Sequence, residues 1–163
     1  MKNKIIVFFF LFSFNSFSQV RYESPEHKEF TIVLPGEVYF NSTKDVKVPY
    51  EEFYNDDFEL VLTVYSGYLY EYLPDLSEEV SLSADALQIT EARKFLKGSM
   101  SNIINYEFYI GFSKNYNSNV IFGIIQDSFS RKLYEVELYC LNLNLNNTTE
   151  IINSIQIDKY TIN

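Results

Sequence analysis

Hydrophobic and polar residues alternate along three segments of the chain, which is the pattern of a β-strand with one buried face. The first segment is Phe58–Tyr65, the second covers residues 105–112, and the third is Leu133–Leu141. In the third segment the alternation shifts after Cys140, and a bulge or the end of the strand accounts for the shift. We therefore predict three half-buried strands, with Cys140 on the apolar face of the last one.

Two other apolar runs predict strands of a different kind. Phe30–Leu34 reads FTIVL and stops at Pro35-Gly36, a pair of residues typical of a turn. Val120–Gln126 is apolar on both faces, which indicates a central strand covered on both sides. A weaker strand is predicted around Val46–Val48, and Ile155–Ile157 is predicted to close the fold.

A helical period favours a long helix over Leu82–Lys97. Residues at steps of three and four are Leu82, Ala86, Ile89, Arg93 and Leu96, and all but Arg93 are apolar. Ser81 or Ser83 is the expected cap of this helix, and Gly98 fits the position just after its end. A short helix over residues 147–154, capped by Asn147 or Thr148, follows near the C-terminus.

The order of these elements predicts the fold class. An antiparallel meander covered by one long and one short helix is an α+β domain, here an α-β-α sandwich. The single domain is expected to span residues 30–163, after a flexible polar lead over residues 19–29 that contains Pro25. Residues 71–81, with Pro74 and several acids, are predicted to form a loop.

The first 18 residues have the order of a signal peptide. Lys2 and Lys4 precede the unbroken apolar run Ile5–Phe12, and Ser16-Phe17-Ser18 offers small residues at a peptidase site. Cleavage there leaves Gln19 as the first residue. We therefore expect export to the periplasm or the extracellular space.

A membrane anchor is the competing interpretation of this segment. A spanning helix needs about 20 apolar residues, and Ser13 and Asn15 interrupt this stretch too early. No later stretch is long and apolar enough to span a bilayer, so we expect no transmembrane segment after cleavage.

The composition narrows the classes of partner. Removal of the two signal lysines changes the formal net charge from −9 to −11, and such a surface repels nucleic acid backbones and anionic lipids. The single cysteine excludes an intramolecular disulfide. The many tyrosines allow a sugar-binding interpretation, although aromatic residues mostly serve cores.

Short motifs at both ends resemble those of the PsbP-like domain family and its bacterial exported relatives. The segment FTIVLPGE resembles the start of these domains, Arg131–Tyr134 resembles their penultimate element, and Ile151–Ile157 resembles their last element. The resemblance covers about residues 29–157 and implies an α-β-α sandwich that acts as a binding or assembly module, usually without catalysis. It implies no site residue that can be transferred to this chain.

A catalytic constellation is missing from the sequence. His27 is the only histidine, and it is expected to be a solvated residue of the lead rather than a general base or metal ligand. Cys140 is expected to be a buried, inert thiol rather than a nucleophile. There is no nucleophile elbow, no P-loop and no dinucleotide-binding glycine motif.

The sequence contains several pairs of acidic residues, and we expect their carboxylates to be exposed to solvent. They are Glu51-Glu52, Asp56-Asp57, Glu78-Glu79, and Glu135 with Glu137. Glu135 and Glu137 share the strand face opposite Cys140, which we expect to be wet; a carboxylate-based enzyme needs two acids that face each other across a cleft. The acids of residues 51–57 carry oxygen ligands suited to Ca²⁺, without the spacing of an EF-hand loop.

We therefore expect an exported, non-enzymatic binding or assembly module for an unknown protein or small ligand. No catalytic, cofactor-binding or metal-binding residue is predicted, and the oligomeric state is left open. A structural envelope or surface protein is one alternative, and a small carboxylate-based hydrolase is the other.

Overall fold

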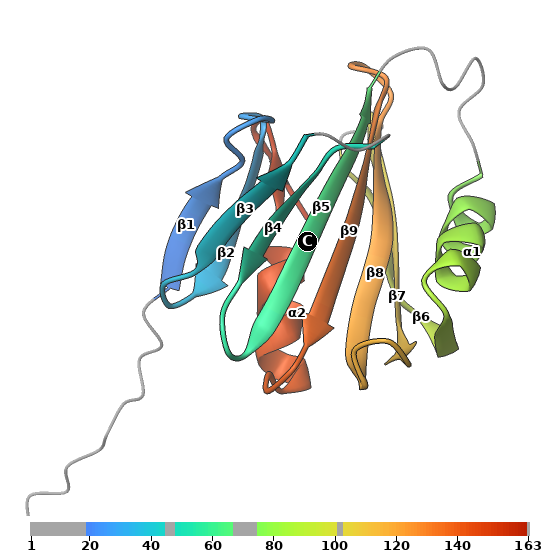
Figure 1. The fold of residues 1–163 in the computed structure, drawn as a ribbon. Helices are drawn as coiled ribbons and strands as arrows, with labels where there is room; N and C mark the ends of the chain where they lie inside the picture. The colour runs from blue at the N-terminus through green and yellow to red at the C-terminus, as the bar shows by residue number, and fades with distance from the viewer. Residues whose placement is uncertain (1–18, 45–47, 67–74, 101–102, 163) are drawn as a thin grey trace, which may run out of the picture.

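A computed structural model describes residues 19–44, 48–66, 75–100 and 103–162 (Figure 1). Its main element is a seven-stranded antiparallel sheet in the order β3-β4-β5-β9-β8-β7-β6. These strands are β3 (Tyr39–Thr43), β4 (Tyr50–Tyr54), β5 (Phe58–Ser66), β6 (Ile89–Met100), β7 (Ile104–Ser113), β8 (Ser118–Asp127) and β9 (Lys132–Cys140). Because β7, β8 and β9 are neighbours both in the chain and in the sheet, the predicted meander is confirmed.

A second, four-stranded sheet packs against one face of the main sheet. It has the order β1-β2-β10-β11 and consists of β1 (Gln19–Glu23), β2 (Phe30–Pro35), β10 (Gln156–Ile157) and β11 (Tyr160–Thr161). Helix α2 (Leu145–Asn153) lies on the same side as this sheet, and helix α1 (Leu76–Ala86) lies on the other side (Figure 1). The α+β class is thus confirmed, as two antiparallel sheets with two packed helices.

The two faces of the main sheet bury different cores. On the inner face, which carries the four-stranded sheet and α2, Phe30, Leu60 and Ile152 are fully buried in the larger core. On the outer face, which carries α1, Val80 packs with Phe122 in a smaller core. Burial of apolar side chains on both sides contributes most of the stability of such a layered fold.

Strand β8 is covered on both faces, as its sequence predicts. Ile121 and Ile125 belong to the inner core, whereas Phe122 and Ile124 belong to the outer core. Strands β5 and β9 also keep their predicted faces, with Leu60 and Leu138 directed inward. The shift of pattern after Cys140 is the end of β9.

The predicted helix over Leu82–Lys97 is wrong. The helix is α1, which begins earlier, where Asp75 caps it by accepting a hydrogen bond from the Ser77 backbone. It ends at Ala86, with Leu87 as its C-cap, and its buried positions are Val80 and Ala84. The predicted loop over residues 71–81 is accordingly wrong where α1 begins, and residues 71–74 lie outside the described part of the chain.

The second half of the predicted helix is strand β6. It pairs with β7 and carries register shifts between Thr90 and Arg93 and between Lys94 and Leu96. Each shift inserts one extra residue into the alternation of this strand. Apolar residues on one face of the bulged strand are therefore three residues apart in places, which is also a spacing found in a helix. Gly98 lies inside this strand rather than after a helix. A Cβ atom there would come within 2.2 Å of the Tyr106 hydroxyl oxygen, so glycine suits the close packing at this position.

The remaining differences concern short elements. The lead is not wholly flexible, because residues 19–23 form β1 and pair with β2. Helix α2 is capped by Asn144, not by Asn147 or Thr148. Strands β3, β4 and β11 were not predicted, and the weak strand at residues 46–48 falls mostly outside the described residues.

The signal segment, residues 1–18, lies outside the described part of the chain, so the signal peptide stays a prediction. Within the described residues, no helix has the length and apolar character needed to cross a membrane.

Candidate functional site

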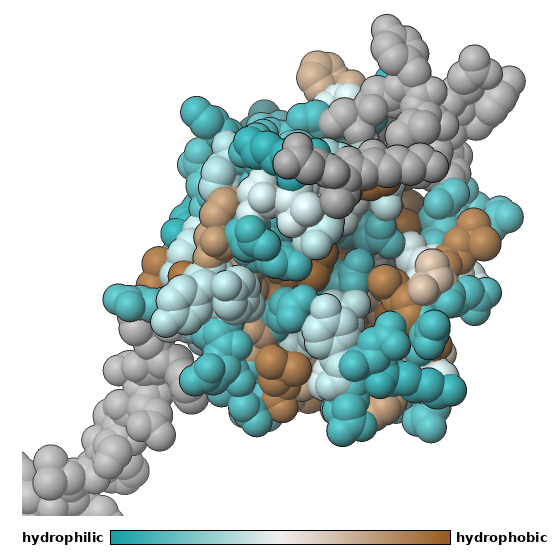
Figure 2. Space-filling view, viewed as in Figure 1, coloured by the Kyte–Doolittle hydropathy of each residue, from teal (hydrophilic) through white to brown (hydrophobic). Residues whose placement is uncertain are grey.

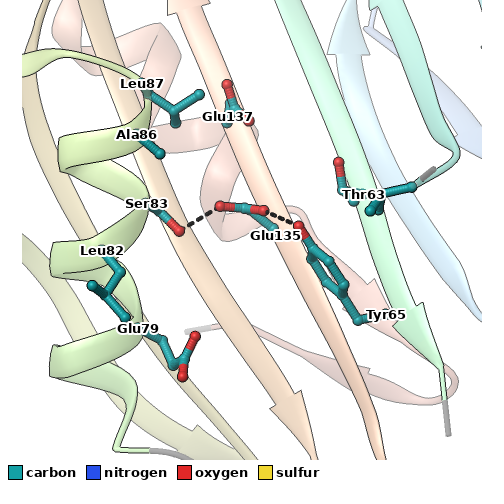
Figure 3. A pocket seen from close by; sticks show the side chains of 10 residues that line it. Thr63, Tyr65, Glu79, Leu82, Ser83, Ala86, Leu87, Glu135 and Glu137 are labelled. Carbon is teal, nitrogen blue, oxygen red and sulfur yellow. Dashed lines mark hydrogen bonds between the residues drawn. The ribbon is translucent and has the colours of Figure 1, made fainter. Parts of the chain in front are cut away.

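A cleft of about 430 Å³ lies on the outer face of the main sheet, between α1 and strands β5 and β9 (Figure 3). Helix α1 lies chiefly against β6, β7 and β8, and therefore leaves this neighbouring part of the sheet open. The residues that line the cleft are Val48, Thr63, Tyr65, Glu79, Leu82, Ser83, Ala86, Leu87, Glu135 and Glu137.

The walls of the cleft differ in chemistry. The helix side presents the aliphatic residues Leu82, Ala86 and Leu87, whereas the strand side presents the carboxylates of Glu135 and Glu137 (Figure 3). Leu82 is 58% exposed, so it is an apolar wall that the protein's own core leaves uncovered.

Glu135 is held in place by two hydroxyl groups. Ser83 of α1 donates to one carboxylate oxygen, and Tyr65 of β5 donates to the other at 2.9 Å (Figure 3). Because both oxygens have a donor, this carboxylate is oriented before any ligand arrives. Three elements of the fold thereby meet at one side chain.

Glu137 is the most buried acid of the cleft. Its residue is 8% exposed, and the Tyr139 hydroxyl donates to its Oε2 atom. The Oε1 atom accepts no hydrogen bond from any residue that the structure describes. Burial raises the pKa of Glu137 to about 7, the Tyr139 hydrogen bond opposes the rise, and the charges of Glu135 and Glu59 add to it.

Glu79 approaches the same space from α1. Burial raises the pKa of this side chain, and the nearby charges of Glu78 and Glu135 raise it further. No lysine, arginine or histidine is among the described residues that line the cleft. Carboxylates that lack a cation and are partly desolvated favour their neutral form, which explains the direction of these shifts.

The acidic character extends along the open part of the sheet. The strand register places Glu52 and Glu59 on the same outer face as Glu137. The ring of Tyr116 stacks on Tyr139 with centroids 3.9 Å apart, and its hydroxyl donates to Glu59 at 2.9 Å. Figure 2 shows a mainly hydrophilic surface on this side, with small hydrophobic groups between the polar ones.

The expectation that Glu135 and Glu137 lie on a wet face is wrong for Glu137. Sequence alternation placed both residues correctly opposite Cys140, but Glu137 is buried and accepts a hydrogen bond from the Tyr139 hydroxyl. The roles of Ser83 and Glu79 were missed because the helix was placed too late in the chain. The sequence did carry one signal for the cleft: the alternation in β5 places Thr63 and Tyr65 on one face of that strand, and β5 pairs with the strand of the two glutamates.

The acids of residues 51–57 do not come together as a cation site. Glu51 is buried on the inner face, where it accepts hydrogen bonds from the Ser24 hydroxyl at 2.6 Å and the Glu26 backbone at 3.0 Å. Its neighbour Glu52 faces the opposite side of the sheet. In the described part of the chain, no group of three or more His, Cys, Asp or Glu residues is arranged to hold a metal ion.

His27 is half-buried rather than fully solvated. Its backbone donates to the Ser24 hydroxyl at 2.8 Å. Its residue lines a second cavity of about 280 Å³, together with Tyr50 and Glu51. Glu51 already has two donors there, and the other described carboxylate of this cavity, that of Glu26, pairs with Lys44.

Cys140 lies on the inner face of β9, as predicted, and is half-buried. Its Sγ atom lies 3.6 Å from the Leu138 carbonyl oxygen and 3.6 Å from the Thr148 hydroxyl. Burial raises the pKa of this thiol, and the contact with Thr148 opposes the rise. A thiol with a raised pKa is a poor nucleophile.

Comparison with known proteins gives no assignment: no protein-family model matches the chain, and no curated protein matches it either. The resemblance to PsbP-like domains therefore remains a prediction from short motifs. Function has to be inferred from the chemistry of the cleft.

Proposed function

We propose that the chain is an exported binding module without catalytic activity, and that the cleft between α1, β5 and β9 is its ligand site. The observation that supports this best is Glu137, a buried residue whose Oε1 atom accepts no hydrogen bond from the described part of the chain. Partial desolvation of a carboxylate costs free energy, and a ligand that donates a hydrogen bond to it recovers part of that cost. Sites of this kind are concave and combine apolar walls with a few convergent polar groups.

Binding is favoured over catalysis by the state of the other acids. Both oxygens of Glu135 accept hydrogen bonds, from Ser83 and Tyr65, and these bonds lower the reactivity of this carboxylate as a nucleophile. Among the described residues that line the cleft, none offers an imidazole or basic side chain to share proton transfer. A pocket with oriented acceptors and an aliphatic wall suits recognition.

One observation favours a second candidate, a carboxylate-based hydrolase. Glu79, Glu135 and Glu137 do converge on one cleft, and the pKa of Glu137 of about 7 is suited to a general acid. Such an enzyme would need a second carboxylate to act as base or nucleophile. Of the three, Glu79 accepts no hydrogen bond from the described residues and would have to take that role.

The two candidates are separated by a binding screen followed by an activity screen. Mixed small molecules are added to the isotope-labelled purified protein, and amide chemical shifts are recorded. We expect hits that shift residues of α1 and β9 around the cleft, and no turnover in a broad hydrolase screen. Turnover that Glu137→Gln abolishes would establish the enzyme instead.

A matched pair of variants locates the site. Leu82→Trp places a bulky ring at the cleft wall, whereas Leu145→Trp changes a similarly exposed leucine on α2, at the other side of the molecule. We expect Leu82→Trp to remove binding of the hits and Leu145→Trp to leave it unchanged. Equal binding to both variants would contradict the proposed location.

A further inference from the structure

We infer that the ligand of this cleft carries a positively charged organic group, a primary ammonium or a guanidinium, on a short aliphatic body. The inference rests on the proposed function, because it names the chemical class that the cleft selects. It follows from three features of the cleft: the negative charge of its lining, the free carboxylate oxygen of Glu137 and the aliphatic wall.

The charge of the lining is negative and uncompensated. Three glutamates line the cleft, and the described lining residues include no basic side chain. The lysines of the described strands of the main sheet are paired elsewhere: Lys94 and Lys97 with Glu107, at 2.8 Å and 2.7 Å, and Lys132 with Glu29. The cleft therefore attracts cations and repels anions.

The free oxygen of Glu137 favours a ligand group that donates a hydrogen bond. The residue is nine-tenths buried and lines the cleft, and its Oε1 atom has no donor among the described residues. An ammonium group has three donors and no acceptor, so it can pair with this oxygen. Glu135, fixed by Ser83 and Tyr65, adds negative charge without any rearrangement.

The aliphatic wall specifies the body of the ligand. Leu82, Ala86 and Leu87 present apolar surface beside the carboxylates. The volume of about 430 Å³ falls within the usual range for small-molecule sites. Lysine and arginine side chains have this combination of a methylene stem and a charged head.

A bare metal ion fits less well. Calcium takes six to eight oxygen ligands, and the described residues contain no cluster of three or more metal-ligating side chains. The wall of Leu82, Ala86 and Leu87 also gives a hydrated ion nothing to contact. An organic cation uses both walls of the cleft.

The probe is pentylamine, and its matched control is pentanol, which has the same chain without the charge. Binding is followed by amide chemical shifts in the purified protein at pH 8. We expect pentylamine to bind at least about tenfold more tightly than pentanol, because only the cation pairs with the carboxylates. Equal affinities would overturn the inference about charge.

Two variants test the role of Glu137. Glu137→Gln is expected to weaken pentylamine binding by about tenfold, whereas Glu150→Gln, an equal change of charge on the exposed surface of α2, is expected to leave it unchanged. Equal weakening by both variants would mean that only the net charge matters, and would overturn the assigned site.

The affinity should also depend on pH. Glu135 and Tyr139 of β9 and Glu59 of β5 face Glu137, and Glu79 of α1 lines the same cleft. Since the pKa of Glu137 is about 7, pentylamine must displace a proton at pH 6 but not at pH 8. We expect about tenfold tighter binding at pH 8, and a flat profile in Glu137→Gln.

A tetralysine peptide distinguishes the two sources of such a cation. Tighter binding of the peptide than of pentylamine, with the same loss in Glu137→Gln, assigns the cleft to a basic segment of a partner protein. Binding of pentylamine alone assigns it to a free amine. If neither cation binds while other hits remain sensitive to Leu82→Trp, the inference fails and the proposed ligand site stands.

Discussion

Two buried carboxylates on the outer face of the main sheet have opposite surroundings. Glu107 of β7 is fully buried, and it receives the amines of Lys94 and Lys97 at 2.8 Å and 2.7 Å. Glu137 of β9 is almost as buried, but from the described residues it receives one hydroxyl group and no cation. The two residues share the same face of the same sheet, but α1 contacts the strand of Glu107 and leaves the strand of Glu137 largely open.

Their neighbours give them opposite pKa shifts. Burial alone would raise the pKa of Glu107, but hydrogen bonds from Lys94, Lys97, Tyr109 and Ser77 lower it to about 2. Burial raises the pKa of Glu137 to about 7. Burial therefore does not decide the state of a carboxylate; the number and charge of its donors do.

Glu107 stabilises the fold, whereas Glu137 is a candidate ligand-binding residue. Glu107 joins β7 to β6 through the lysines and to α1 through the Ser77 hydroxyl, at 3.0 Å from both carboxylate oxygens. It thereby fixes the helix that forms one wall of the cleft. Glu137 forms no such link, and its burial is a cost that a ligand can offset.

The largest effect is expected from Glu107→Gln. The substitution removes the charge between two lysines, and we expect a loss of about 3 kcal/mol in the free energy of unfolding at pH 7. Urea denaturation measures it, with Glu150→Gln as a surface control that should change stability by less than about 0.5 kcal/mol. A loss as small as the control's would mean that the lysines do not stabilise the helix through Glu107.

The dependence of the free energy of unfolding on pH, measured at acidic pH, tests the same residue. The folded-state pKa of Glu107, about 2, lies below its ordinary value of 4.5, so its contribution is present above about pH 4.5 and is lost as the pH falls toward 2. Glu107→Gln should flatten this part of the profile.

The next effect is a gain, from Glu137→Gln. The folded-state pKa of about 7 lies above the ordinary value of 4.5, so ionisation of Glu137 destabilises the fold progressively as the pH rises between these values. We expect the variant to be more stable than the wild type by about 2 kcal/mol at pH 8 and nearly equal to it at pH 4. Thermal unfolding at both pH values measures this; a variant less stable at pH 8 would show that the native carboxylate is compensated after all.

A smaller difference is expected between two serines of α1. Ser77→Ala removes a donor to the fully buried Glu107, and we expect a loss of about 1 kcal/mol. Ser83→Ala removes one of two donors to the half-buried Glu135, where water replaces it, and we expect about 0.5 kcal/mol. Urea denaturation of the two variants compares them directly, and the reverse order would contradict the contrast between the two carboxylates.

The smallest effect is expected on the opposite face of β9. Cys140→Ser places a hydroxyl beside the Leu138 carbonyl and the Thr148 hydroxyl, which provide partners, so we expect a loss below about 0.5 kcal/mol. The native thiol should react slowly with a labelling reagent and quickly in urea, because burial raises its pKa. Rapid labelling of the native protein would place Cys140 in solvent and contradict the packing of β9.

The sequence by itself determined the strands whose alternation is regular. In β5, β7 and β9 the period of two is a property of the extended backbone, so Leu60, Phe108 and Leu138 identify the inner face without further knowledge. The apolar run of β8 likewise indicated a strand covered on both sides. The opposition of Glu137 to Cys140 followed from the same rule.

Only the tertiary structure decided where α1 ends and what surrounds the acids. Two register shifts in β6 gave a strand the spacing of a helix, and only pairing with β7 resolves that ambiguity. Glu107 and Glu137 are indistinguishable in their own strands, because each is an acid among apolar residues. They differ because Lys94, Lys97 and Ser77 reach one of them from distant parts of the chain, and charge compensation depends on distance in space rather than on position in the sequence.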